Sequence, residues 1–145
     1  MKKSTWGLVF LIGLSSCLTA GSFSRDDTKE VVIDSAANLM WQDDADAKTV
    51  TKTWEDAIDY CETLTLGGFD DWHLPNRNEL KSIVDYSRVN PAIDPTFRNV
   101  VSTGYWSSTT VAGHASAAWL VRFNGGGDYW GAKTDMWYVR CVRDN

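Results

Sequence analysis

The three cysteines of this 145-residue chain limit its fold more than any other feature. Cys17 follows a short apolar segment near the N-terminus, whereas Cys61 and Cys141 lie far apart in the rest of the chain. A bond between the last two would tie the middle of the chain to its end and close a long loop. If Cys17 is not available for a disulfide bond, Cys61 and Cys141 can pair within the chain only with each other.

The first 16 residues have the pattern of an export signal. Lys2 and Lys3 give a basic start, and residues 6–14 form an apolar run, which is shorter than the roughly 20 residues of a membrane-spanning helix. The sequence Leu14-Ser15-Ser16-Cys17 resembles a bacterial lipobox, which implies cleavage before Cys17 and acylation of its thiol, for example with palmitate. The alternative is an ordinary secretory signal, cut near Ala20, with an incidental cysteine.

A lipoprotein of this kind would have three parts: a signal peptide (1–16), a lipidated cysteine with a flexible tether (17–29), and a folded domain (30–145). The segment from Leu18 to Lys29 is small and polar without periodicity, which favours a tether. Two or three acyl chains anchor a protein stably, so the membrane is an expected partner. The residue after the lipidated cysteine directs sorting in enterobacteria, where Asp keeps a lipoprotein in the inner membrane. Leu18 stands at this position, so in a Gram-negative cell the protein is expected in the outer membrane, on its periplasmic or its outer face.

If Cys17 carries lipid, the two remaining cysteines of an exported chain most simply pair, so we expect a disulfide between Cys61 and Cys141. Two free, buried thiols are the alternative. A zinc site would need more closely spaced ligands than these cysteines, His73 and His114 provide, so we expect no metal site.

The charge balance argues against nucleic acid as a partner, since 14 basic residues face 19 acidic ones and the net charge is −5. Hydrophobic residues make up 43% of the chain, which is enough for a packed core. Acidic residues gather in the N-terminal half, so an anionic ligand would meet the C-terminal part.

Two helices are predicted, each by a capping box. Thr53 and Asp56 begin the first, whose apolar positions then repeat at helical spacing through Cys61. Asn76 and Glu79 begin the second. Cys61 lies on the apolar stripe of the first helix, so its disulfide would bind that helix to whichever strand holds Cys141.

Extended segments make up the rest of the predicted fold. Short runs at 31–33 and 39–41 flank Asn38, which tolerates a left-handed turn, and predict a hairpin. Runs rich in aromatic and β-branched residues predict strands at 105–109, 117–123 and 136–142. In the last of these, alternation places Trp137, Val139 and Cys141 on one face and Tyr138 and Arg140 on the other. The predicted class is α+β.

Several spaced motifs agree with this order of elements: Leu39-Met40-Trp41-Gln42, Tyr60-Cys61, the run from Gly68 to Pro75, Asn78-Glu79-Leu80, Tyr105-Trp106-Ser107-Ser108-Thr109, residues 118–123 and residues 138–143. Together they resemble the Lcl C-terminal domain family over residues 31–143. The resemblance implies a C-type-lectin-like fold, with two helices packed on antiparallel sheets and a loop region presenting a ligand surface. It also implies that Cys61 and Cys141 are the family's disulfide pair. The family is named for a bacterial collagen-like surface adhesin.

The sequence does not predict an enzyme. A serine triad needs an imidazole base, and the two histidines, His73 and His114, fall in a structural motif and in a loop. The acidic groups Asp70-Asp71 and Asp43-Asp44-Asp46 are expected in solvated loops, and the second lacks the full spacing of a calcium loop. We therefore expect no catalytic residue and no cofactor.

Aromatic residues are the best candidates for ligand binding, because flat rings stack on sugars or anchor protein interfaces. Tyr129 and Trp130 follow three glycines and are expected in an exposed loop; rings folded back over the sheet are the alternative. The candidate ligand patch consists of His114, Asp128, Tyr129, Trp130 and Lys133. Tryptophans in apolar patterns are expected in the core, namely Trp41, Trp54, Trp72, Trp106 and Trp119.

Taken together, these features predict an envelope-anchored lipoprotein that presents an adhesin-like module to a glycan or protein ligand. The alternative is a structural or assembly lipoprotein of the envelope without an external ligand. A hydrolytic enzyme is a third, less favoured interpretation.

Overall fold

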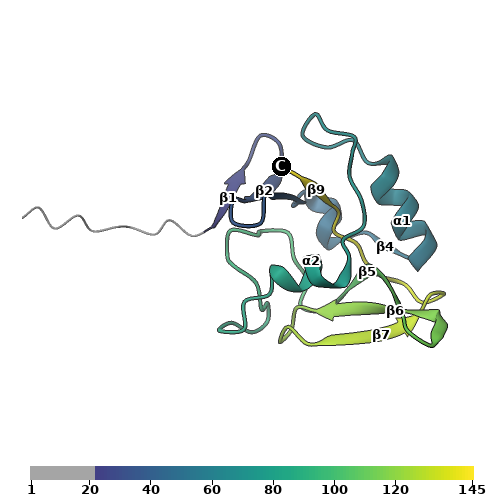
Figure 1. Cartoon of the computed structure of the whole chain (residues 1–145). Coiled ribbons are helices and arrows are strands. Elements are labelled where there is room, and N and C mark those ends of the chain that lie inside the picture. Colours follow the sequence, from purple (N-terminus) through teal and green to yellow (C-terminus); the bar gives the residue numbers. More distant parts are fainter. Residues whose placement is uncertain (1–21) are drawn as a thin grey trace, which may run out of the picture.

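A computed structural model describes residues 22–145 (Figure 1). The predicted signal peptide, Cys17 and the start of the predicted tether lie outside the described residues. Within 22–145, no helix is long and apolar enough to cross a membrane.

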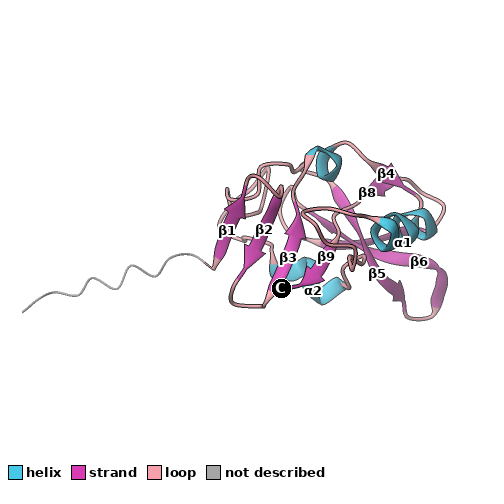
Figure 2. Cartoon of the chain, turned by 90° about the horizontal axis from the view of Figure 1, so that it is seen from above, coloured by secondary structure: helices cyan, strands magenta, loops and turns pink. Residues whose placement is uncertain are grey.

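Two sheets form the framework (Figure 2). The first is antiparallel and has the order β1-β2-β3-β9, with bounds Phe23–Asp26, Val31–Asp34, Leu39–Gln42 and Val142–Asp144. The second has the order β4-β8-β5-β6-β7, with bounds Thr51–Lys52, Trp137–Tyr138, Gly104–Val111, His114–Arg122 and Asp128–Ala132. Its strands are antiparallel except for the β5–β8 pair, which is parallel.

Over residues 22–145, two α-helices and one short 3-10 helix, η1 (Ala45–Lys48), accompany the sheets. α1 (Trp54–Thr63) begins at Thr53, whose hydroxyl accepts from the Asp56 N–H. α2 (Arg77–Ser82) begins at a reciprocal capping box between Asn76 and Glu79. The predicted helices, the α+β class and the hairpin at Asn38, whose φ is +53°, are therefore confirmed.

The core has two parts, one on each face of the five-stranded sheet. Trp106 and Leu120 pack on one face with α1, whereas their strand neighbours Tyr105 and Val121 pack on the other with α2. Of the five tryptophans expected in the core, Trp41, Trp72 and Trp106 are buried, and Trp54 and Trp119 are half-buried.

The predicted disulfide is confirmed: Cys61 of α1 is bonded to Cys141, 80 residues later, and both are fully buried. Cys141 belongs to the short connection between β8 and β9, not to a strand. The bond therefore joins α1 to the segment at which the chain passes from one sheet to the other.

The single strand predicted at 136–142 is wrong. The chain pairs as β8 with the five-stranded sheet, leaves it over residues 139–141, and pairs again as β9 with the four-stranded sheet. The side chains still alternate, because Val139 and Cys141 lie in the α1 core while Arg140 points toward Phe97 and Tyr105 of the α2 core. A sequence pattern with period two shows this alternation but not the change of sheet.

The tether expected up to Lys29 is also wrong for residues 23–29. β1 pairs along its length with β2, the Phe23 ring meets Phe97 edge-on at 5.3 Å, and Arg25 forms an ion pair with Asp43. These contacts order a segment whose composition alone is that of a linker. The fold thus begins no later than Phe23.

Candidate functional site

The exposed aromatic rings of the five-stranded sheet lie on its edge strand, β7. Tyr129 exposes 49% of its surface and Trp130 exposes 54%, although both belong to a strand and not to the loop that was expected. Neighbouring residues of a strand point to opposite faces. The two rings are therefore presented on the two sides of β7.

On the α2 side, Trp130 stacks with His114. Their ring centroids are 5.2 Å apart and their planes differ by 25°. His114 begins β6, next to the β5–β6 turn, and Trp130 pairs with Trp119 in the β6–β7 ladder. The structure thus brings together two residues of the predicted patch, and Trp119 extends the same face.

The side chain of Arg77 supports this face from α2. Its guanidinium lies 3.8 Å from the centre of the Trp119 ring, and its Nε donates to Asp128 Oδ2 at 2.7 Å. Lys81 also reaches Asp128, at 3.4 Å. The hydrogen bond from Arg77, with a smaller contribution from Lys81, holds the pKa of Asp128 below its usual value. Asp128 therefore fastens α2 to β7 and is not a free acceptor for a ligand.

On the α1 side, Tyr129 lies against Arg122, whose guanidinium is 4.3 Å from the ring centre. The same guanidinium is 5.6 Å from the ring centre of Trp137 on β8. Arg122 and Trp137 were not part of the predicted patch. Alternation along the strand predicted at 117–123 indicates that Arg122 shares a face with Leu120. That Trp137 of β8 lies near Arg122 on this face is seen only in the structure.

Lys133, the last residue of the predicted patch, lies beside a separate pocket at the start of α1. Its Nζ is 3.8 Å from the centre of the Trp54 ring and donates to Thr110 Oγ1 at 3.0 Å. The pocket has a volume of about 220 Å³ and is lined by Thr53, Glu55, Lys133 and Thr134. Lys133 therefore lines this pocket, where its ammonium group already contacts Thr110 and the Trp54 ring.

The expectation that Asp43 lies in a solvated loop is wrong. Its carboxylate is fully buried and accepts from the Arg140 guanidinium at 2.9 Å, from Arg25, and from the backbone N–H groups of Arg98 and Asn99. Arg140 is also fully buried, and this burial lowers the pKa of its guanidinium. Buried charges need such paired acceptors and donors, so Asp43 holds the fold together and is not available to a metal.

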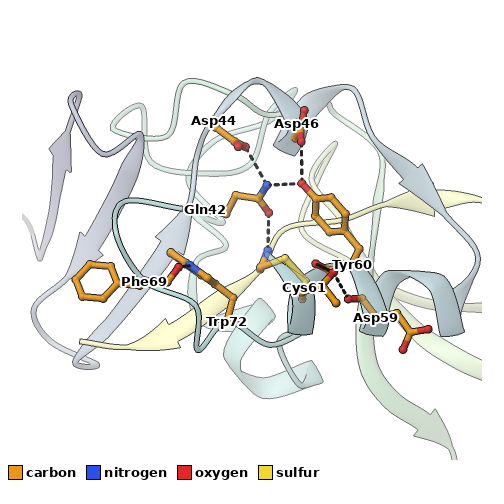
Figure 3. The surroundings of a disulfide bond; sticks show 10 residues. Gln42, Asp44, Asp46, Asp59, Tyr60, Cys61, Phe69 and Trp72 are labelled. Carbon is orange, nitrogen blue, oxygen red and sulfur yellow. Dashed lines mark hydrogen bonds between the residues drawn. A yellow bond between two sulfur atoms is a disulfide. The ribbon is translucent and has the colours of Figure 1, made fainter. Parts of the chain in front are cut away.

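A hydrogen-bond network lies beside the disulfide (Figure 3). The Gln42 amide donates to Asp44 at 2.9 Å and to the Tyr60 hydroxyl at 3.0 Å, and its oxygen accepts from the Cys141 N–H. The Tyr60 hydroxyl in turn donates to Asp46 at 3.0 Å. Burial raises the pKa of Asp44 and of Tyr60 above their ordinary values. These groups fix the strand end next to Cys141, which is a structural role.

His73 and Asp71 each take part in a surface pair. His73 lies 3.4 Å from Glu79, and Asp71 accepts from the Arg143 guanidinium at 2.6 Å. Among residues 22–145, no three His, Cys, Asp or Glu side chains are grouped so as to hold a metal ion. On β7 itself, the two exposed rings are flanked by His114 on one face and by Arg122 on the other.

Comparison with known protein families places this sequence in a family. The model of the Lcl C-terminal domain matches residues 30–143, which is most of the chain. No curated protein matches the sequence.

Proposed function

Because the chain belongs to the Lcl C-terminal domain family, we propose that it is a binding module whose ligand, a carbohydrate, is recognised by the exposed rings of β7. The observation that carries the proposal is that Tyr129 and Trp130 each leave about half of their surface in solvent while their backbone is fixed in a strand. A ring held in this way loses little entropy when a ligand stacks on it.

The polar groups beside the rings are suited to hydroxyl-bearing ligands. Arg122 lies over Tyr129, and His114 lies over Trp130. Sugars combine apolar C–H faces, which stack on aromatic rings, with hydroxyl groups, which need donors and acceptors at the ring edge. A guanidinium and an imidazole supply these donors, and the guanidinium would also favour a sugar that carries an acidic group.

We further propose that the module is held at the cell envelope by a lipid on Cys17, most simply in an outer membrane. The support is the lipobox resemblance of residues 14–17 and the confirmed disulfide, which is typical of exported proteins. Mass spectrometry of the native protein tests this directly. An acylated N-terminal cysteine is expected, and an unmodified start at another residue would contradict it.

A glycan array tests the ligand class. A chain starting at Ser22, which keeps β1, should bind a subset of the glycans, and Trp130→Ala should reduce that binding at least about tenfold because one stacking ring is lost. Tyr86→Ala is the matched control, since Tyr86 is 68% exposed but lies outside β7. Its binding should equal that of the unmodified chain.

Two results would contradict the carbohydrate proposal. If no glycan binds, the rings would instead serve a protein partner, which crosslinking in the envelope would identify. If generic ester or glycoside substrates are turned over, the module would be an enzyme. Equal melting temperatures of Trp130→Ala and the unmodified chain are needed to show that a lost signal reflects binding and not unfolding.

A further inference from the structure

β7 is an unpaired edge of the five-stranded sheet. The strand order ends in β6-β7, and Figure 1 shows β7 along the border of the molecule, with no further element of the described part of the chain beside it. Edge strands expose backbone N–H and C=O groups that can pair with another chain.

The hydrogen bonds of the β6–β7 ladder show which residues point outward. Backbone bonds join Lys133 to Ser116 at one end of the ladder and Arg122 to Gly127 at the other. Bonded and non-bonded pairs alternate in an antiparallel ladder, so the N–H and C=O groups of Asp128, Trp130 and Ala132 point away from β6. Of these six groups, only the Ala132 carbonyl has a backbone partner within 22–145, the Asp135 N–H, and a carbonyl can accept a second bond.

The other sheet edges are less suited to pairing. β4 has two residues, β1 has four, and β9 has three, of which Val142 already exchanges backbone hydrogen bonds with His73. In β7, the one charged residue is Asp128, which Arg77 and Lys81 already neutralise. β7, with five residues, is therefore the longest edge strand in the described part of the chain.

We propose that β7 pairs antiparallel with β7 of a second copy of this chain, around a two-fold axis at Trp130. In this register each Trp130 lies opposite the other Trp130, and each Tyr129 lies opposite Gly131, whose missing side chain leaves room for the ring. Asp128 lies opposite Ala132, so no two like charges meet. The same segment is thus complementary to itself, as a two-fold interface requires.

The pairing would join the five-stranded sheets of the two copies into one continuous sheet. It needs no ligand, but it shares the Trp130 ring with the carbohydrate proposal, so a variant outside that ring is needed to separate the two. If both proposals hold, the two copies would present their rings side by side, and a polymeric ligand could contact both.

Native mass spectrometry of the full chain in detergent tests the interface. The unmodified chain should be dimeric. Trp130→Lys and Trp130→Glu should each weaken dimerisation at least about tenfold, because two like charges then lie opposite each other in place of two stacked rings. An equal mixture of the two variants should restore a mixed dimer, since lysine then faces glutamate.

A second variant separates the interface from the ligand surface. Ala132→Pro removes one outward N–H but leaves the β6–β7 ladder and both rings intact, so it should weaken the dimer while each copy still binds glycan. Three results would overturn the inference: an unmodified chain that is monomeric, a dimer that tolerates both Trp130→Lys and Ala132→Pro, or variants that fail to form the mixed dimer. Loss of glycan binding alone would count only against the proposed function.

Discussion

At the scale of single residues, the most consequential side chain is one that looks ordinary in the sequence. Asp43 precedes Asp44 and Asp46, and all three suggest a solvated acidic loop. In the structure only Asp43 is buried, where it accepts from two guanidinium groups and two backbone N–H groups. The difference arises from Arg25 and Arg140, which approach from remote parts of the chain, and no local pattern shows their approach.

Replacing this carboxylate should strongly destabilise the fold. Asp43→Asn removes the negative charge that faces the buried Arg140, and breaking a buried pair in this way costs about 3–5 kcal/mol of the free energy of unfolding. Urea unfolding followed by circular dichroism measures this cost. Asp59→Asn is the control, because Asp59 is exposed on α1 and should change stability by less than about 0.5 kcal/mol.

The ion pair at Asp128 should respond to acid. The hydrogen bond from Arg77, with a smaller contribution from Lys81, lowers the pKa of Asp128 below its ordinary value of 3.8. The pair therefore stabilises the fold at pH values above the pKa of the unfolded chain, and this stabilisation is lost as the pH falls through the pKa of the folded protein. Arg77→Gln should move the pKa of Asp128 up toward 3.8, as measured by NMR titration of the carboxyl carbon. Arg98→Gln, a change of an exposed arginine that pairs with Asp27, should leave that pKa where it is.

At the scale of elements, the predictions succeeded where the signals are local. A capping box and a helical repeat lie within a few residues of each other, and both helices begin where these signals place them. β7 was missed because it follows three glycines and contains a fourth, a composition that favours turns. β1 was missed because its order depends on Phe97 and Asp43, which lie far along the chain.

The N-terminal cap of α2 should contribute to the stability of the fold although the helix has only six residues. Asn76→Ala removes the side-chain acceptor for the Glu79 N–H, and loss of such a cap should lower the free energy of unfolding by about 1 kcal/mol. Asn78→Ala tests the same chemical change at an exposed position inside the helix, where alanine is the better helix former. Its unfolding midpoint in urea should be equal to or above that of the unmodified chain.

At the scale of the whole molecule, the candidate site was predicted only in part. His114 and Trp130 do come together, but Tyr129 faces the other side of β7, Asp128 is held by α2, and Lys133 lies by another pocket. The sequence places residues 128–130 in a loop, and a loop gives no reason to assign neighbouring side chains to opposite faces. Because these residues belong to strand β7, the Tyr129 and Trp130 rings lie on different faces of the sheet.

The disulfide should be a large part of the stability of the molecule. It closes a loop of 80 residues, and replacing both Cys61 and Cys141 by alanine should cost roughly 4.5 kcal/mol on the chain-entropy estimate. Urea unfolding of the double variant measures this cost. Treatment of the unmodified chain with a reductant should lower its unfolding midpoint in the same direction, whereas a midpoint insensitive to reduction would contradict a stabilising role.

Residues 139–141 connect the two sheets and carry Val139 of the α1 core, Arg140 of the buried ion pair and Cys141 of the disulfide. A cut of the chain just before residue 139 would therefore remove β9, leave Asp43 without Arg140 and leave Cys61 without its disulfide partner. One proteolytic event at this connection would open the α1 core and the buried ion pair together.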